Sequence, residues 1–204
     1  IIKFINSLAE KINNDPRIDN KIKVVFIENY DVSKAELIIP AADVSEQIST
    51  TTKEASGTGN MKLMMNGAIT LATLDGANIE IFDQVGEDNI VIFGLSANEV
   101  LNYNKFGGYS ALDLYNSNRV IKRVVDDLVN GFIPNMEKEG RQIYDSLITY
   151  NDEYFVLRDM ENYIEAQEKI DRLYKNKEKW NEMALINIAN SGVFSSDRTI
   201  AEYA

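Results

Sequence analysis

The chain has 204 residues, of which 45% are hydrophobic and 26% charged, a composition typical of a folded globular protein. Its net charge of −11 argues against a nucleic-acid or anionic-membrane partner, because phosphate-rich partners require a basic surface. The sequence contains no cysteine and no histidine, which excludes disulfides, zinc–thiolate sites and a Ser-His-Asp triad, and no metal site is expected. No apolar run approaches the roughly 18 residues of a membrane helix.

A helix is predicted at the start of the chain, because apolar side chains recur there at spacings of three and four residues. These side chains are Ile1, Ile2, Phe4, Ile5, Leu8, Ala9 and Ile12. The chain begins inside this pattern, without an N-cap, and its last helical segment stops without a C-cap signal. We therefore expect it to be a fragment of a longer protein.

Three short apolar segments predict buried strands, namely residues 22–27 (IKVVFI), 69–74 (ITLATL) and 89–93 (NIVIF). Two capping boxes, Ser33-x-x-Glu36 and Ser96-x-x-Glu99, predict helices between and after these strands, and Pro40 should end the first helix. Strands that alternate with helices indicate an α/β fold with a mostly parallel sheet. In such a sheet the strand-to-helix loops gather at one edge, where ligands bind.

From residue 111 onward the strand signals fade and helical stripes replace them. The stripes comprise Val120, Ile121, Val124, Val125, Leu128 and Val129, then Tyr163, Ile164, Ile170, Leu173 and Tyr174, then Trp180, Met183, Ala184, Ile186 and Ile188. Their aromatic and methionine side chains are interpreted as core. We divide the chain into a sheet part, residues 1–110, and a helical part, residues 111–204, with residues 131–140 as the flexible connection.

Residues 54–62 (EASGTGNMK) contain too many small polar residues to pack a core. A helix that begins at Thr58 or Gly59 would direct free backbone N–H groups toward an anion such as phosphate, and the glycines would let the backbone approach it. Lys62, one turn later, would be a charge partner or, if buried, a nucleophile. The alternative is a solvated loop with a surface lysine. Neither the P-loop nor the G-x-G-x-x-G fingerprint fits. The P-loop requires a glycine directly before its lysine, but Gly59 stands three residues before Lys62, and the sixth position of the fingerprint, counted from Gly57, is Lys62 rather than glycine.

Two stretches of the sequence resemble the C-terminal catalytic segment of the glycogen and maltodextrin phosphorylases. They are residues 28–50 (ENYDVSKAELIIPAADVSEQIST) and 54–81 (EASGTGNMKLMMNGAITLATLDGANIEI), and residues 187–204 (NIANSGVFSSDRTIAEYA) match as well. The GTGNMK centre with its flanking EAS is hard to reach by chance. The resemblance implies a Rossmann-like, mostly parallel sheet with flanking helices and a helical C-terminal tail. Residues 1–204 would then be a fragment of the C-terminal, pyridoxal-phosphate-binding domain of a GT-B type glycosyltransferase.

The resemblance also implies a reaction, the phosphorolysis of terminal α-1,4-glucosyl units to α-D-glucose 1-phosphate with retention. The catalytic position is Lys62, which matches the lysine that carries pyridoxal 5′-phosphate as a Schiff base. In this family the phosphate of the cofactor, rather than its ring, exchanges a proton with substrate phosphate. Such chemistry needs no histidine or cysteine from this segment, and no carboxylate pair of the kind glycosidases use. Asp126 and Asp127 are the obvious acidic pair to consider, but adjacent residues on a predicted helix do not face each other, so their carboxylates cannot act together.

The resemblance assigns further residues to the site. Thr58 and Gly59 match positions that contact the cofactor phosphate; Glu54, Ala55, Ser56 and Gly57 match residues that hydrogen-bond glucosyl hydroxyls; Tyr30, Val32, Ala35 and Gln47 match residues that line the cofactor pocket. Asp31 is a departure, because many members carry an arginine there, near the cofactor phosphate.

In the family, the basic residues that hold substrate phosphate and the whole N-terminal domain precede the segment that begins at Ile1. The isolated chain is therefore expected to be inactive and to bind the cofactor poorly. The resemblance implies a cytoplasmic, homodimeric parent whose partners are α-1,4-glucan and inorganic phosphate; its preference among glucans would be set elsewhere. Two alternatives are a nucleotide-sugar glycosyltransferase, in which Lys62 pairs with a diphosphate, and a regulatory or scaffolding homologue that binds glucan without turnover.

Overall fold

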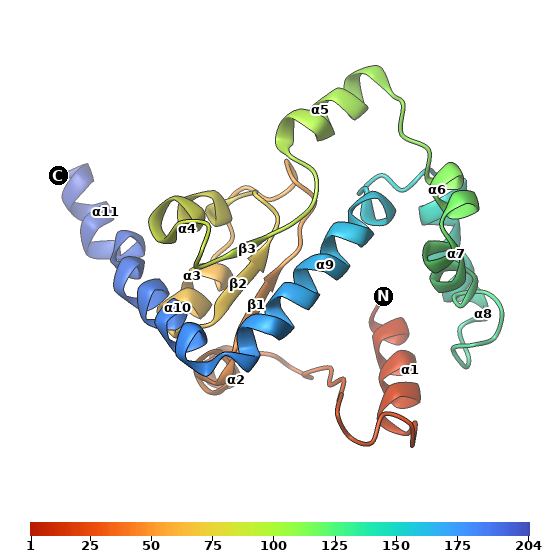
Figure 1. Ribbon diagram of the computed structural model, residues 1–204, viewed down its shortest axis with the longest axis horizontal. Coiled ribbons are helices and arrows are strands. Elements are labelled where there is room, and N and C mark those ends of the chain that lie inside the picture. The colour runs from red at the N-terminus through yellow and green to blue at the C-terminus, as the bar shows by residue number, and fades with distance from the viewer. The chain divides into compact units, whose positions relative to one another are not determined.

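The computed structural model describes residues 1–204, and their contacts divide the chain into two compact units (Figure 1). The helical unit comprises Ile1–Tyr30 and Gly108–Arg158, and the sheet unit comprises Asp31–Gly107 and Asp159–Ala204. The chain thus passes between the units at three points, and the units interleave along the sequence, whereas the predicted division at residue 110 is sequential. Residues 131–140, the predicted connection, lie within the helical unit.

The sheet unit is built on three parallel strands in the order β1-β2-β3. They are β1 (Val44–Gln47), β2 (Ile69–Ala72) and β3 (Val91–Ile92). The central strand β2 is buried along its whole length, which explains why its sequence is apolar rather than alternating. The predictions of an α/β fold, of a parallel sheet and of strands in 69–74 and 89–93 are confirmed, although both strands are shorter than predicted.

Helices cover the sheet and form two apolar clusters with it. In one cluster, Ile69, Leu71 and Val91 of the strands pack against α9 (Val156–Lys175) and α10 (Lys177–Asn190), as Figure 1 shows for α9. The other cluster joins α3 (Gly59–Met65), α4 (Ala77–Val85) and Ile90. Trp180 and Met183 belong to the first cluster, so their assignment to the core is confirmed, whereas the same assignment is wrong for Tyr174, which is 39% exposed. The remaining elements of this unit are α2 (Val32–Ile38), the 3-10 turn η1 (Ile39–Ala41), α5 (Ala97–Phe106), the 3-10 turn η3 (Ser191–Phe194) and α11 (Ser196–Tyr203).

One predicted capping box is confirmed and the other is wrong. The hydroxyl of Ser96 accepts from the Glu99 amide, and the Glu99 carboxylate accepts from the Ser96 amide, at the start of α5. Helix α2 instead begins at Val32, one residue before Ser33, because the carboxylate of Asp31 accepts from the Lys34 amide at 3.0 Å and caps the helix. The predicted effect of Pro40 holds, since α2 gives way to η1 at this proline.

The strand predicted at residues 22–27 is wrong, because this segment forms no strand and most of its apolar side chains are exposed. Its main chain is held only locally, where the side chain of Asn13 donates to the Val24 carbonyl and accepts from the Val24 amide. A strand needs a neighbour that completes its ladder of backbone hydrogen bonds, and none lies beside this segment.

The helical unit contains α1 (Ile2–Asn13), α6 (Ala111–Ser117), α7 (Arg119–Asp126), α8 (Glu137–Tyr144) and the π-helix η2 (Asp145–Thr149). Lys3 of α1 forms an ion pair with Glu139 of α8 at 2.8 Å. The stripe predicted for residues 120–129 is buried at Ile121, Val125 and Leu128 and about half exposed at its other positions. Neither unit has a helix with the length and apolar character needed to cross a bilayer.

Candidate functional site

The small-residue segment connects the carboxyl end of β1 to helix α3, as its sequence predicts. Thr58 is the N-cap residue of α3 and Gly59 is its first residue, so the predicted helix start is confirmed. The Thr58 side chain makes no capping hydrogen bond, and the first N–H groups of a helix have no backbone partner within the helix. A Cβ added at Gly59 would meet no atom within 4 Å, so the backbone here borders open space.

Lys62 lines a cavity of about 400 Å³ that is formed by α2, η1 and α3. Val32 and Ala35, both singled out in the sequence, line the same cavity. Its other lining residues are Glu36, Ile39, Pro40 and Asn66. The volume lies within the range of small-molecule sites in proteins. Lys62 itself is exposed, so the structure gives the surface lysine rather than the buried one, and the cavity combines its amine with the Glu36 carboxylate, the Asn66 amide and an apolar wall.

The remaining predicted residues lie in several places. Residues 54–57 form the largely exposed approach to α3. Gln47 ends β1, and its side-chain amide donates to the Ser45 hydroxyl at 3.0 Å rather than lining the cavity. Tyr30 is the last residue of the first segment of the helical unit. The carboxylate of Asp31 caps α2.

The turn that follows β2 holds the approach segment through its main chain, a feature that the sequence analysis missed. Asp75 is buried, and its Oδ2 atom accepts from the amides of Lys53 at 3.0 Å and Glu54 at 2.7 Å. The amide of Ala77 donates to the Ser56 carbonyl at 2.7 Å. The available signal was the Asp75-Gly76 pair directly after a buried strand, because such turns lie at the ligand-binding edge of a parallel sheet.

Two buried asparagines connect this turn to helix α3. The Asn60 side chain donates to the Asn78 side-chain oxygen at 2.9 Å, and Asn78 donates in turn to the Thr73 carbonyl at 3.2 Å. The Oδ1 atom of Asn60 accepts from the Met61 amide at 2.9 Å. Buried hydrogen bonds thus fix the start of α3 to the residues that follow β2.

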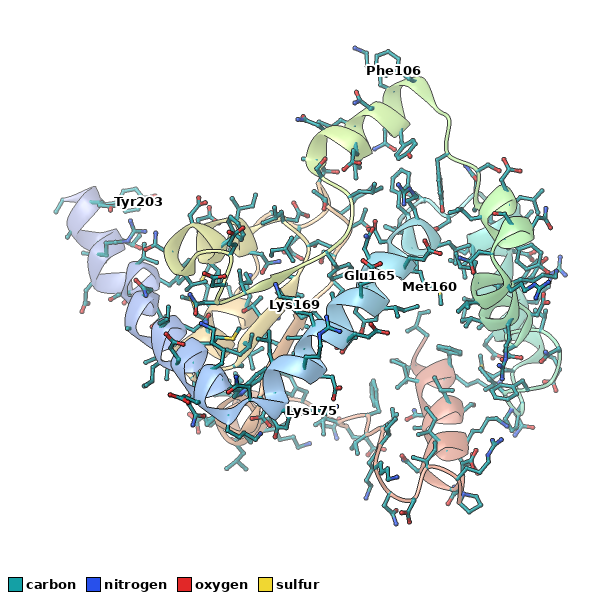
Figure 2. All side chains as sticks on the ribbon, viewed as in Figure 1. Phe106, Met160, Glu165, Lys169, Lys175 and Tyr203 are labelled. Atoms are coloured by element: carbon teal, nitrogen blue, oxygen red, sulfur yellow. The ribbon has the colours of Figure 1, made fainter.

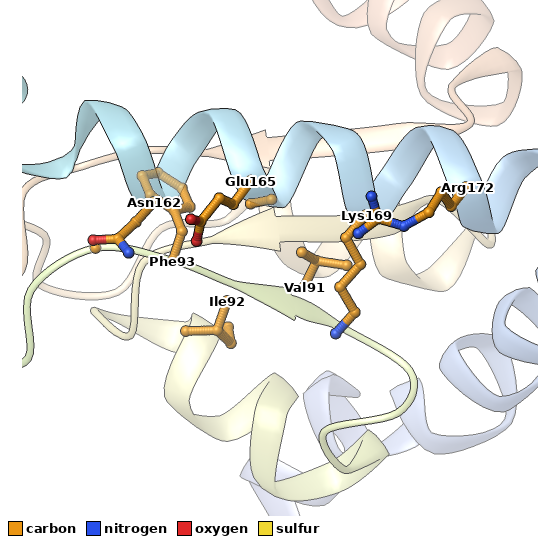
Figure 3. Close-up of a pocket in the computed structure, with 9 residues that line it drawn as sticks. Val91, Ile92, Phe93, Asn162, Glu165, Lys169 and Arg172 are labelled. Atoms are coloured by element: carbon orange, nitrogen blue, oxygen red, sulfur yellow. The ribbon is translucent and has the colours of Figure 1, made fainter.

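A second cavity, of about 470 Å³, lies between β3 and α9 and is shown in Figure 3. Asn162, Glu165, Lys169 and Arg172 project from α9 around it, and Figure 2 shows Glu165 and Lys169 one helical turn apart. These four side chains are exposed, and Glu165, Lys169 and Arg172 carry charges of both signs, so they do not define one class of ligand. The cavity contains none of the site residues predicted from the sequence, and the candidate site is the one around Lys62.

Comparison with known proteins matches the whole chain to one family. The sequence profile of the carbohydrate phosphorylases matches residues 1–204. The chain is 58% identical to glycogen phosphorylase of Bacillus subtilis, 48% identical to the human liver form and 44% identical to the human muscle form, in each case over all 204 residues. It covers 26% of the bacterial protein and 24% of each human protein, so it spans about a quarter of the length of these relatives.

Proposed function

Because this chain belongs to the carbohydrate phosphorylase family, we propose that it is the C-terminal part of an α-glucan phosphorylase, from the pyridoxal-phosphate-binding domain of a GT-B type enzyme. The parent would release α-D-glucose 1-phosphate from the ends of α-1,4-glucans by phosphorolysis with retention. The observation that carries the proposal is the open cavity that the exposed Lys62 lines together with Val32 and Ala35. The names of the similar proteins support the glucan and phosphate substrates.

The residues around the cavity fit pyridoxal 5′-phosphate. Lys62 is the one lysine that lines it and would anchor the cofactor through its amine, while Val32, Ala35 and Pro40 provide an apolar wall for a flat ring. The uncapped start of α3, at Thr58 and Gly59, would hold the phosphate with backbone N–H groups. When bound, the cofactor supplies a phosphate group that exchanges a proton with the substrate phosphate.

The segment 54–57 would bind the glucosyl unit. Glu54 offers carboxylate oxygens to sugar hydroxyls, Ser56 offers a hydroxyl, and Ala55 and Gly57 offer backbone groups. All of them precede α3, so the sugar and the cofactor would be held by one continuous stretch of chain. Gln47 and Tyr30 are proposed to complete the cofactor pocket in the parent. The parent itself would be a cytoplasmic homodimer that acts on α-1,4-glucan and inorganic phosphate.

Reduction of the full-length parent with borohydride tests this proposal. A pyridoxyl group on Lys62, mapped by peptide mass spectrometry, is the expected result, because reduction fixes the cofactor to the lysine that holds it. A Lys62→Ala variant should lose the label, and a Lys53→Ala variant, altered in the same segment, should keep it. Folded parent that stays unlabelled with the cofactor supplied, and that uridine diphosphate protects against thermal unfolding, would favour a nucleotide-sugar glycosyltransferase instead.

A further inference from the structure

We propose that Asp75 is a positioning residue for segment 54–57, which it orients through the main chain without touching substrate. This inference rests on the proposed function, because it assigns a role relative to the glucosyl-binding segment. The resemblance that identifies the site residues does not assign Asp75. Its role follows from three contacts that the turn after β2 makes with the approach to α3.

The first contact is electrostatic. The Asp75 carboxylate is only 7% exposed, and one oxygen atom accepts from two consecutive backbone amides, those of Lys53 and Glu54. Hydrogen bonds from amides to a carboxylate are among the strong ones in proteins, and low exposure strengthens them further. Asp75 itself is fixed, because its amide donates to the Thr73 carbonyl and it follows the wholly buried strand β2.

The second and third contacts involve the residues that follow Asp75. The Ala77 amide donates to the Ser56 carbonyl at 2.7 Å. Gly76 lies between Asp75 and Ala77, and a Cβ added there would lie 2.5 Å from the Ser56 carbonyl oxygen. Only glycine therefore allows the turn and segment 54–57 to approach this closely. The turn therefore holds the segment near both of its ends, at Glu54 and at Ser56.

This arrangement leaves the side chains of Glu54 and Ser56 exposed on a fixed backbone. Such preorganisation matters for catalysis, because a displacement of about 1 Å can lower a rate about a hundredfold. Asp75 does not line the cavity of Lys62. Loss of its carboxylate should therefore impair sugar binding and turnover while leaving attachment of the cofactor intact.

The first experiment compares Asp75→Ala with Asp83→Ala in the full-length parent. Asp83 is an exposed carboxylate on α4, near in sequence but outside the turn. We expect kcat/KM for α-D-glucose 1-phosphate to fall at least about tenfold in Asp75→Ala and to stay near the wild-type value in Asp83→Ala. The pyridoxyl label on Lys62 and the KM for inorganic phosphate should change less than about twofold, which separates positioning from general unfolding.

Hydrogen exchange provides a readout that does not depend on turnover. The amide of Glu54 should exchange faster in Asp75→Ala, because its acceptor is gone, and should be unchanged in Asp83→Ala; the Lys53 amide keeps the Thr50 carbonyl, at 2.9 Å, as an acceptor. Unchanged exchange at the Glu54 amide would contradict the contact itself. Faster exchange with wild-type kinetics for glucose 1-phosphate would contradict the positioning role.

The second experiment compares Gly76→Ala with Gly86→Ala, since the two glycines flank α4 in similar backbone conformations. Their angles are φ 51°, ψ −143° and φ 74°, ψ 164°, so alanine is strained at both. Only at position 76 would the new methyl group meet the Ser56 carbonyl; at 86 it would meet nothing within 4 Å. Gly76→Ala should reproduce the kinetic loss of Asp75→Ala, and Gly86→Ala should not. Equal kinetic losses in the two variants would overturn the inference.

The outcomes also separate this inference from the proposed function. Wild-type parent that lacks both the pyridoxyl label on Lys62 and glucose 1-phosphate turnover would overturn the proposed function, and the role of Asp75 with it. A labelled and active wild type, with Asp75→Ala equally active, would overturn the role of Asp75 alone.

Discussion

At the scale of one residue, Gly140 marks a close approach of two backbone segments in the helical unit. It lies buried in α8 with its Cα against the backbone carbonyl of Leu128, and a Cβ at this position would overlap that carbonyl oxygen. Backbone atoms cannot give way as a flexible side chain can. Here glycine is required by space rather than by backbone angles, because no positive φ accompanies it.

Gly140→Ala should therefore destabilise the chain by about 1–3 kcal/mol, as overpacking does, although alanine is the better helix former. Thermal unfolding followed by circular dichroism would detect this as a drop of about 2–4 °C per kcal/mol for a chain of this size. Gly192→Ala is the matched control, because a Cβ there meets nothing within 4 Å. A Gly140→Ala variant as stable as the control would contradict the predicted overlap.

At the scale of elements, polar side chains connect helix α9 to strand β1. The Tyr163 hydroxyl donates to the Glu46 carboxylate at 3.0 Å, and Gln167 donates to the same carboxylate and to the Tyr163 oxygen. The Tyr163 ring also packs edge-on against Phe93, with 5.2 Å between ring centroids. Burial raises the pKa of the Tyr163 phenol above its usual range, and the nearby Glu46 charge adds to this effect.

The raised pKa predicts how stability depends on pH. The unfolded chain ionises this tyrosine near pH 10, whereas the folded chain resists ionisation, so its contribution is complete below about pH 10 and is lost as the pH rises through the folded pKa. Near pH 8 the unfolding free energy of Tyr163→Phe should be about 0.5–1.5 kcal/mol below that of the wild type. Between about pH 8 and 10.5 the unfolding free energy of the variant should fall by less than that of the wild type. Urea unfolding of the variant and the wild type at about pH 8 and about pH 10.5 measures these free energies.

Tyr150→Phe is the control for that measurement, because Tyr150 is 75% exposed. Its pH dependence should match that of the wild type. If Tyr163→Phe lost as much stability as the wild type over the same pH interval, the assigned cause would be incorrect.

The elements also show where sequence reasoning succeeds and where it fails. Strands β2 and β3 were predictable because burial makes their sequences apolar. Strand β1 (VSEQ) was not, because its polar sequence becomes a strand only through pairing with β2, with Val44 opposite Ile69. Residues 22–27 show the converse, since an apolar segment without a neighbouring strand forms no strand and stays largely exposed. Pairing with a neighbouring strand decides both cases, and a short stretch of sequence does not show whether such a neighbour exists.

The candidate site could be predicted only where the local sequence determines its structure. The unusual composition of 54–62 and the start of α3 follow from the local sequence. The meeting of Lys62 with Val32 and Ala35 in one cavity was anticipated only through resemblance to a family, because no pattern links them. The contact of Asp75 with the Lys53 and Glu54 amides depends on the return of the chain through β2, which no local pattern encodes.

At the scale of the whole molecule, the net charge of −11 bears on the proposed reaction. An acidic chain disfavours binding of inorganic phosphate, and the resemblance to the phosphorylases implies that the basic residues that hold this substrate precede Ile1 in the parent. We therefore predict that the purified 204-residue chain releases no measurable glucose 1-phosphate from glycogen, whereas the full-length parent does. A coupled assay under identical conditions makes the comparison. Phosphorolysis by the isolated chain would contradict this prediction.

The interleaving of the two units has a consequence for biosynthesis. Residues 31–107 supply all three strands, but α9 and α10, which pack on Ile69, Leu71 and Val91, come mainly from residues after Arg158. A ribosome adds about 5–20 residues per second, so this apolar face of the sheet stays uncovered for on the order of 10 s while the second half of the helical unit is made. The nascent chain should therefore recruit chaperones during this interval, and it should release them only when Trp180 and Met183 have left the exit tunnel.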